Sequence, residues 1–386
     1  MCEGEGDMKL TGSEILIECL KADGVRTIFA LAGGVVFKIF DMLHQQKDIE
    51  VVLTRHEQGA GHMAEGYAKA TGKAGVCLVT SGPGMTNVIT ALADAYMDSV
   101  PLVCISGQVS TSLIGNDAFQ EADNIGLSRP CTKYNFLVKD VNDLATTIKE
   151  AFYIATTGRP GPVLVDIPKD VSMAKTEFTY PSSVSIRGYN PTYEGNKWQI
   201  KQAAEAIMKA KKPILYVGGG VVFSQASKEL LELAEMTQIP VDMTLMGLGA
   251  FPGEHPQSMG MMGMHGTYCA NMAVHYSDLV IAVGARFDDR VTGKVSEFCP
   301  FAKVIHIDID PSNIGKIKKP HITLVADAKT ALAAISEKLS DVSKKKLDAG
   351  KTKRRDWWTK LKGWRDSVPF SCEYSATEIK PQQVIE

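Results

Sequence analysis

The sequence lacks the patterns by which chains are exported, anchored or cross-linked. None of its eight cysteines forms a CxxC pair, and no apolar run reaches the roughly 18 to 20 residues that span a bilayer. Cys77 and Cys104 lie inside apolar runs typical of strands, so we expect free, buried thiols in a reducing compartment. The acidic N-terminus contains neither the apolar stretch of a secretory signal nor an arginine-rich import pattern. We therefore expect a cytoplasmic protein.

An excess of charge of either sign is also absent. Lysine and arginine total 42 residues against 44 aspartates and glutamates, which gives a net charge of -2 at pH 7. Because no basic field is available for nucleic acid or an acidic membrane, small metabolites are the expected ligands. None of the eight histidines stands at the spacing of metal ligands, so we predict no metal site within these residues.

Apolar runs alternate with helical patterns over the first half of the sequence. We expect strands at residues 27–30, 49–53, 75–80, 101–106 and 162–167, with helices starting near Phe37, after Glu57, near Met85 and at Val141. This order predicts a parallel sheet covered by helices on both faces. Ligands then belong at the carboxyl ends of the strands.

A second unit of the same kind is expected after a polar, aperiodic stretch at residues 176–196, which we interpret as a linker. The second unit has expected helices at residues 198–211 and 228–237 and expected strands at residues 213–217, 239–243, 278–283, 303–308 and 322–325. The predicted fold class is therefore α/β, with two doubly wound parallel-sheet domains at residues 8–175 and 197–342. The charged run at 344–355 is interpreted as a second linker, and the tryptophan-rich segment 356–364 as a helix pinned onto its neighbour.

Several residues stand where a parallel sheet binds ligands, although each also has a purely structural explanation. Glu57 opens a helix directly after a strand, where a glutamate usually serves the helix dipole. The glycines at 33–34 and 82–84 follow strands, but the second group lacks the third glycine of a dinucleotide loop, and Pro83 removes a donor. Asp308 and Asp310 end a strand, where they could bind a ribose or simply be solvated. The methionine- and glycine-rich stretch 260–266 suits either a wall against a flat ligand or the filling of core gaps.

Residues 55–87, RHEQGAGHMAEGYAKATGKAGVCLVTSGPGMTN, resemble the cofactor-activating segment of thiamine-diphosphate enzymes, and specifically of the acetolactate synthase (acetohydroxyacid synthase) family. Further blocks at residues 106–109, 115–121, 157–170 and 284–290 resemble the same family in the same order. The resemblance extends from about residue 8 to the C-terminus. Ordered blocks of this length are far more specific than a single glycine motif.

The resemblance implies thiamine diphosphate, FAD and Mg²⁺ as cofactors. Glu57 would be the catalytic residue, because a carboxyl against the pyrimidine nitrogen favours the imino form that removes the thiazolium C2 proton. Gly34, Gln120 and Lys169 are expected to assist Glu57 in catalysis. Phe119, Gln120 and Lys169 are expected to line the substrate approach. Without the resemblance, the sequence pattern would indicate that Gln120 and Lys169 are ordinary surface residues. The family usually has proline where this sequence has Ala32, so fine positioning of that loop is expected to differ.

The residues at matching positions fall into two groups. Those expected to bind thiamine diphosphate are Gly33, Gly34, Glu57, Pro83, Asn87 and Gln120, and those expected to bind FAD are Arg159, Gly219, Thr244, Leu245, Met246, Met264, His265, Gly266, Gly284, Ala285, Arg286, Asp288, Arg290, Asp308, Ile309, Asp327 and Ala328.

The implied reaction condenses two pyruvates, or pyruvate and 2-oxobutyrate, with loss of carbon dioxide, in branched-chain amino-acid biosynthesis. The family would make the chain a homodimer or homotetramer with a possible small regulatory subunit. Residues 343–386 are expected to contain a linker, a helix and the start of a truncated diphosphate-binding domain, because the Gly-Asp-Gly motif that holds Mg²⁺ in the family does not occur here. We therefore expect this chain to be inactive alone. The alternatives are another thiamine-diphosphate-dependent 2-oxo-acid lyase or oxidase, and a non-enzymatic flavin-binding module.

Overall fold

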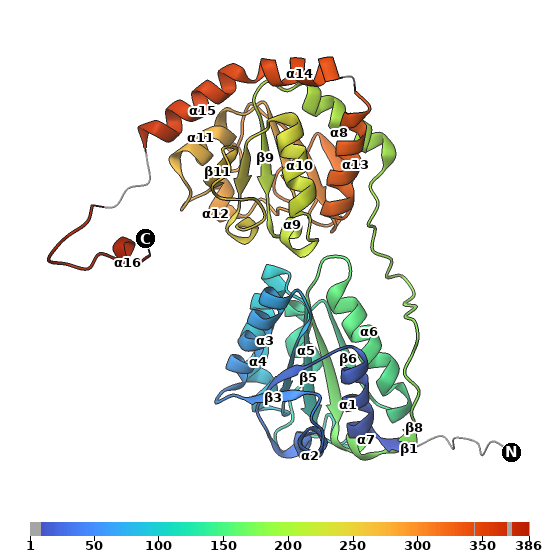
Figure 1. Ribbon diagram of the computed structural model, residues 1–386. Helices are drawn as coiled ribbons and strands as arrows, with labels where there is room; N and C mark the ends of the chain where they lie inside the picture. Colours follow the sequence, from blue (N-terminus) through green and yellow to red (C-terminus); the bar gives the residue numbers. More distant parts are fainter. Residues whose placement is uncertain (1–8, 343, 369–372, 386) are drawn as a thin grey trace. The chain divides into compact units, whose positions relative to one another are not determined.

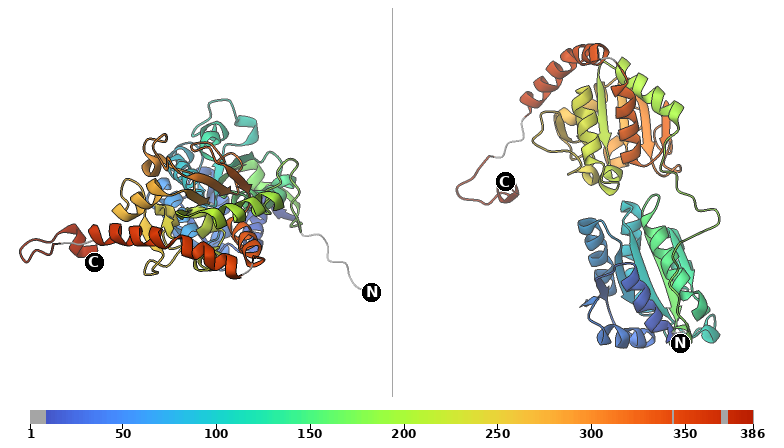
Figure 2. Two further views of the ribbon diagram at one scale, coloured as in Figure 1. Left: turned by 90° about the horizontal axis from the view of Figure 1, so that it is seen from above. Right: turned by 45° about the vertical axis from the view of Figure 1, so that its right-hand side comes forward.

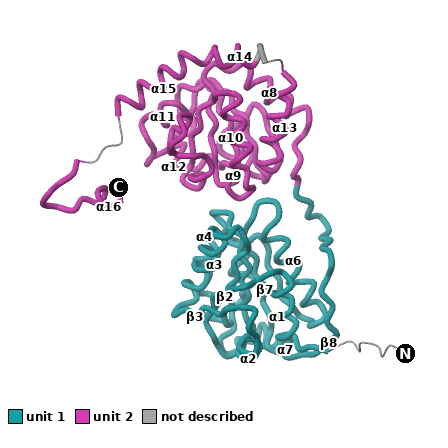
Figure 3. The backbone as a smooth tube through the Cα atoms, viewed as in Figure 1, with its two compact units in different colours: residues 1–191 teal, residues 192–386 magenta. Residues whose placement is uncertain are grey.

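The computed structural model describes residues 9–342, 344–368 and 373–385, with the side chains of 344–346 left aside. Residue 8, the expected start of the first domain, lies outside this part, as do residues 343, 369–372 and 386 of the expected C-terminal segment. The chain divides into two compact units, residues 1–191 and 192–386, which Figure 3 colours separately. Within the described residues no helix combines the length and apolar character needed to cross a membrane.

The first unit contains a six-stranded parallel sheet (Figure 1). Its strands are β2 (Thr27–Ala30), β3 (Glu50–Leu53), β4 (Gly75–Val79), β5 (Leu102–Gln108), β6 (Tyr134–Leu137) and β7 (Pro162–Pro168), in the spatial order β3-β2-β4-β5-β7-β6. Every residue of β4, β5 and β7 is buried, as expected for central strands covered on both faces. A short antiparallel pair, β1 (Lys9–Thr11) with β8 (Lys175–Glu177), joins the two ends of the unit.

Helices cover both faces of this sheet, as the views in Figure 2 show. One face packs against α1 (Gly12–Ala22), α2 (Phe37–Gln45) and α6 (Leu144–Thr156), whose apolar side chains share one core with the strands. The other face carries α3 (Glu57–Thr71) and α4 (Pro83–Asp98). These two helices approach closely because Gly61 has no side chain: a Cβ there would lie 2.4 Å from the Cβ of Ala91.

The second unit repeats the architecture. Its strands are β9 (Pro213–Val217), β10 (Val241–Met243), β11 (Ser258–Met261), β12 (Leu279–Val283), β13 (Lys303–Asp308) and β14 (Ile322–Val325), in the order β11-β10-β9-β12-β13-β14. One face packs against α8 (Lys197–Lys209), α10 (Ser227–Thr237) and α13 (Ala328–Ser340). The opposite face packs against α11 (Tyr268–Tyr276) and α15 (Arg355–Ser367). The predicted α/β fold class with two doubly wound parallel sheets is therefore confirmed.

Several local expectations differ from the structure. Strands β6 and β11 were not expected, because one is a four-residue edge strand and the other lies in the methionine- and glycine-rich stretch. Helix α4 starts at Pro83 rather than Met85, since proline is well suited to the first position of a helix. The charged run interpreted as a linker forms α14 (Lys344–Lys353), whose Leu347 packs on the core of the second unit.

The tryptophan-rich helix α15 is pinned onto its unit, as expected. The indole N–H groups of Trp357 and Trp358 donate to the carbonyls of Pro213 (3.2 Å) and Gln238 (3.0 Å). Arg354, buried just before this helix, donates to carbonyls at the ends of α8 and α10, where a cation interacts favourably with the helix dipoles. The segment is therefore part of the second unit.

The cysteines of the described residues are free and buried, which confirms the expectation for the six of them that the structure covers. They are Cys19, Cys77, Cys104, Cys131, Cys269 and Cys299, while Cys2 and Cys372 lie outside the described residues.

Candidate functional site

The strand order of the first unit marks one place for a ligand. After β2 the chain turns outward to β3, whereas after β4 it turns the other way to β5. The loops that leave β2 and β4 therefore diverge, and a crevice at such a switch point is the usual ligand site of an open parallel sheet. These loops are the two glycine groups recognised in the sequence, at residues 33–34 and 82–84.

Glu57 lies at this place, as the first residue of α3. Its side chain is buried, with only 8% of the residue exposed. The amide of Asn87, from the second turn of α4, donates to Glu57 Oε2 at 3.0 Å. The other oxygen, Oε1, lies 3.5 Å from the position a Cβ would occupy on Gly84. The carboxyl is thus fixed through Oε2 by the Asn87 amide. It lies at the amino-terminal ends of α3 and α4, where the positive ends of the helix dipoles favour a negative charge.

Two unsatisfied hydroxyls lie close to this carboxyl. Thr80 Oγ1 and Ser81 Oγ, directly after β4, are buried and have no hydrogen-bond partner among the described residues. A Cβ on Gly33 would lie 2.6 Å from Thr80 Oγ1, and one on Gly84 would lie 2.7 Å from Thr80 Cγ2. The two glycines thus make room for the Thr80 side chain. Buried polar atoms are rarely left without a partner, so the two hydroxyls indicate a ligand rich in hydrogen-bonding atoms. The aminopyrimidine of thiamine is such a group.

Gln120 reaches the same place from a third loop. It has a left-handed backbone with φ of 58°, and its carbonyl oxygen lies 2.5 Å from where a Cβ on Gly82 would be. Gly82 itself has φ of 56°, so both the conformation and the close approach require glycine there. The neighbouring Phe119 is 89% exposed. Of the residues expected to bind thiamine diphosphate, Gly33, Glu57, Pro83, Asn87 and Gln120 are thus brought together. The space beside Gly34 is open, since no described atom lies within 4 Å of a Cβ built there.

Two other predicted residues of this unit lie elsewhere on the sheet. Lys169 is exposed at the start of α7 (Lys169–Met173), directly after β7. Arg159 precedes β7 and so lies at the amino-terminal edge, where its Nε donates to Ser99 Oγ at 2.8 Å beyond the end of α4. It is therefore at the opposite edge from Glu57.

The second unit has its own switch point between β9 and β12. Here the two backbones touch: a Cβ on Gly220 would lie 2.7 Å from the Cα of Gly284, which has φ of 57°. The remaining predicted flavin residues follow the carboxyl ends of the six strands, so they share one edge of the sheet. Leu245 and Met264, both well exposed there, offer apolar surface beside the bare glycine backbone. An extended dinucleotide fits an edge of this kind.

Asp308, at the end of β13, is 6% exposed and organises the turn that follows it. Its Oδ1 accepts from the Asp310 N–H at 2.9 Å, and Oδ2 accepts from the Asn313 amide at 3.4 Å. Asp327 follows β14, the next strand, and caps α13 by accepting from the N–H groups of Lys329 and Thr330. Both carboxylates therefore have structural partners at the positions where the sequence predicts flavin contacts.

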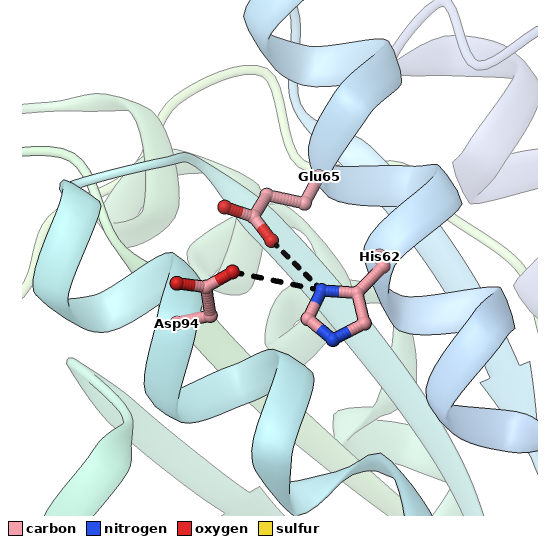
Figure 4. Close-up of side chains that lie close together, drawn as sticks. All are labelled: His62, Glu65 and Asp94. Carbon is pink, nitrogen blue, oxygen red and sulfur yellow. Dashed lines mark hydrogen bonds and ion pairs between the residues drawn. The ribbon is translucent and has the colours of Figure 1, made fainter. Parts of the chain in front are cut away.

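A histidine and two carboxylates also meet between α3 and α4 (Figure 4). His62 Nδ1 lies 3.2 Å from Glu65 Oε2 and 3.6 Å from Asp94 Oδ2. Lys69 Nζ lies 2.8 Å from Glu65 Oε1 and 2.9 Å from Asp98 Oδ2. Burial and the neighbouring Glu65 raise the pKa of Asp94. Because an ammonium group already neutralises the buried carboxylate, we interpret the cluster as an ion-pair network that ties the two helices together.

Sequence reasoning missed two buried carboxyls. Asp166, on β7, is surrounded by hydrogen-bond donors. Asp242, on β10, is 0% exposed, and neither of its oxygens has a hydrogen-bond partner in the described parts of the chain. Both lie inside apolar strands, so the one sequence signal for a buried carboxyl was an aspartate interrupting an apolar run.

Two family descriptions match the chain. The N-terminal TPP binding domain of thiamine pyrophosphate enzymes matches residues 10–127, and the central domain of thiamine pyrophosphate enzymes matches residues 200–335. The first covers the Glu57 site and the second covers most of the second unit's sheet.

Relatives with curated names match over almost the whole chain. The acetolactate synthase large subunit of Buchnera aphidicola (subsp. Schizaphis graminum) is 49% identical over 379 residues, which cover 98% of this chain and 65% of that protein. Acetolactate synthase isozyme 3 large subunit of Escherichia coli (strain K12) is 50% identical over 379 residues, covering 98% and 66%. The acetolactate synthase of Mycobacterium bovis is 50% identical over 379 residues, covering 98% and 61%. The chain thus spans slightly less than two thirds of the length of these relatives.

Proposed function

This chain belongs to the thiamine pyrophosphate enzymes, as a homologue of the acetolactate synthase large subunits, and we propose that it supplies the pyrimidine-activating and flavin-binding parts of an acetolactate synthase. One observation carries the proposal above the others: the buried carboxyl of Glu57 lies at the sheet's switch point, near two buried hydroxyls that have no partner within the described residues. A glutamate that only served the helix dipole would not need to be buried at this place, next to hydroxyls that lack a partner among the described residues.

In the proposed site, Glu57 exchanges a proton with a ring nitrogen of the aminopyrimidine. Asn87 occupies Oε2, which leaves Oε1 as the oxygen that faces the ligand. Thr80, Ser81 and the glycine loops bind the rest of the ring and exclude water from the carboxyl. When bound, thiamine diphosphate supplies the nucleophilic carbon for decarboxylation of a 2-oxo acid and transfer of its two-carbon unit.

The diphosphate and Mg²⁺ must be held by other residues. No Gly-Asp-Gly motif occurs in the sequence, and the one His/Glu/Asp cluster of the described residues is already paired with Lys69. We propose that a diphosphate-binding domain outside these 386 residues completes the site, and that the complete protein assembles as a homodimer or homotetramer that a small regulatory subunit joins. Pyruvate and 2-oxobutyrate are the proposed substrates, with Phe119, Gln120 and Lys169 lining their approach.

The decisive experiment adds a diphosphate-binding domain to the chain. The 386-residue chain is mixed with the separately expressed C-terminal third of the Escherichia coli relative, thiamine diphosphate, Mg²⁺, FAD and pyruvate. We expect acetolactate from the mixture and none from either component alone, because an oriented base cannot act on a cofactor that does not stay bound. Acetaldehyde or an oxidised product would indicate another 2-oxo-acid enzyme, and the absence of any product from a folded mixture would contradict the proposal.

We propose that the second unit binds FAD along the edge lined by Gly219, Gly284 and Asp308. Heat denaturation of chain purified with excess flavin is expected to release about one FAD per chain, measured by fluorescence. Asp308→Asn is expected to weaken binding about tenfold, since it removes a charge-assisted hydrogen bond to a ribose hydroxyl. Asp341→Asn, an exposed carboxylate paired with Lys338, is the matched control and should bind normally. Failure of the wild-type chain to bind FAD in excess would refute the assignment.

A further inference from the structure

Asp166 lies at the centre of a hydrogen-bond network at the carboxyl end of β7. Its side chain is 1% exposed. Oδ1 accepts from Ser106 Oγ at 2.6 Å and from the amide of Asn124 at 2.9 Å, and Oδ2 accepts from the amide of Gln108 at 3.2 Å. Ser106 and Gln108 belong to β5, and Asn124 opens α5 (Asn124–Ser128). One carboxyl thus connects two strands to the start of a helix.

The same donors attach the preceding loop, residues 115–124, to the sheet. The Gln108 amide that binds Asp166 also donates to the carbonyl of Ala122 at 2.9 Å. At its other end the loop is closed by the carboxylate of Glu121, which accepts from the N–H groups of Gly115 and Ala118. The loop is therefore closed on itself at one end, and at the other end it is fixed to the sheet through the partners of Asp166.

Gln120 lies between these two attachments. Its strained left-handed backbone brings its carbonyl against Gly82, in the loop that continues to the Glu57 site through Gly84. A residue with φ of 58° keeps this conformation only where its surroundings hold it. The sheet holds this part of the loop through two hydrogen bonds, from the Gln108 amide to the Ala122 carbonyl and from the Asn124 amide to Asp166.

We propose that Asp166 is a positioning residue, whose ionised carboxyl holds residues 115–124, and with them Phe119 and Gln120, against the glycine loop of the Glu57 site. This inference rests on the proposed function, in which Phe119 and Gln120 border the substrate. An ionised carboxyl accepts at both oxygens, as three converging donors require. An amide would place its N–H group against the amide of Asn124 or of Gln108, and a protonated carboxyl would have to donate to the Ser106 hydroxyl and lose the hydrogen bond that Ser106 donates, so either change weakens the hold on the loop.

The state of this carboxyl depends on pH in a range that can be measured. Burial raises the pKa of Asp166 to about 6, although its three hydrogen bonds act to lower it. Asp123, just before α5, raises it further, and the thiols of Cys104 on β5 and of Cys131 after α5 belong to the same buried environment. Asp166 is thus ionised above pH 6 and takes up a proton as the pH falls through that value. The loop is fixed on the alkaline side and released on the acid side.

Amide hydrogen exchange on the 386-residue chain tests this directly. At pH 7.5 we expect protection factors in residues 115–124 to fall about tenfold in Asp166→Asn, the effect of losing about one hydrogen bond, while the rest of the sheet is unchanged. In the wild type the same loss is expected on going from pH 7.5 to pH 5, after correction for intrinsic exchange, and it should vanish in Asp166→Asn. The control is Asp170→Asn, a nearby carboxylate that holds Thr111 instead.

The outcomes separate the inference from the proposed function. Equal protection in the wild type and Asp166→Asn, or a pH response that survives in the variant, would overturn the positioning role. If Asp166→Asn does not fold, Gln108→Met serves instead, because it removes the links to both Asp166 and Ala122. In the reconstituted mixture, Asp166→Asn should raise the KM for pyruvate about tenfold with a smaller change in kcat. A loop response without acetolactate formation would refute the proposed function alone.

Discussion

Glu57→Gln is expected to lower acetolactate turnover by at least about 100-fold in the enzyme reconstituted with a diphosphate-binding domain. That factor is the lower end of what a general acid or base contributes. Glutamine keeps the volume of the side chain and an oxygen that can accept from Asn87, so the fold should be retained. It cannot exchange the proton that the proposed step requires. The measurement is kcat at saturating thiamine diphosphate and pyruvate.

Glu65→Gln is the matched control for this experiment. It makes the same change to another buried carboxylate of α3, which pairs with Lys69 and His62 and lies outside the proposed site. We expect turnover close to wild type, with stability lowered by about 1–3 kcal/mol because charged partners lose their counterpart. Near-normal turnover in Glu57→Gln, or an equal loss in both variants, would contradict the catalytic assignment.

Asp242→Val is expected to raise the free energy of unfolding at neutral pH by about 1–3 kcal/mol, the usual cost of a buried polar group without partners. Asp242 is fully buried among apolar side chains on β10, beside Tyr216 on β9, whose hydroxyl also has no partner in the described parts of the chain. Burial raises the pKa of Asp242 well above its usual value, so the folded chain holds a neutral acid. Valine removes the polar atoms and suits a central strand.

The same substitution is expected to change the pH dependence of stability. Above about pH 4 the unfolded chain releases the Asp242 proton, whereas the folded chain keeps it. The folded state therefore binds more protons, and wild-type stability falls as the pH rises, by at most about 1.4 kcal/mol per pH unit from this group. Denaturant unfolding at pH 5 and pH 8 should show a smaller decline in Asp242→Val.

Asp242→Asn separates the two contributions. It abolishes the titration but keeps unsatisfied polar atoms, so the pH-dependent decline should shrink as in the valine variant while the gain at neutral pH stays smaller. A valine variant less stable than the wild type at pH 8 would show that Asp242 has a partner or role that the buried strand does not reveal.

The fold class could be predicted because its signals are local and periodic. Buried parallel strands are short apolar runs, and glycine groups follow those that end at a ligand edge. The expectations that differed involve weak local signals: β6 is four residues at an edge, β11 is interrupted by glycine, and α14 is a charged helix held by one apolar side chain and by its neighbour Arg354. In each case packing against a distant segment outweighs the local pattern.

The Glu57 site shows where local reasoning ends. Glu57, Asn87 and the glycines between them lie in one segment of 33 residues, 55–87, so this group can be recognised from the sequence alone. That they meet at a switch point depends on β2 lying next to β4, a pairing no local pattern states. The hydrogen bonds of the Asp166 network join residues that are 42 to 60 positions apart in the sequence. The burial of Asp242 likewise depends on helices from another part of the chain. Periodicity reports which face of an element is apolar, whereas hydrogen-bond partners and desolvation arise only when remote elements pack, and these decide the state of a buried carboxyl.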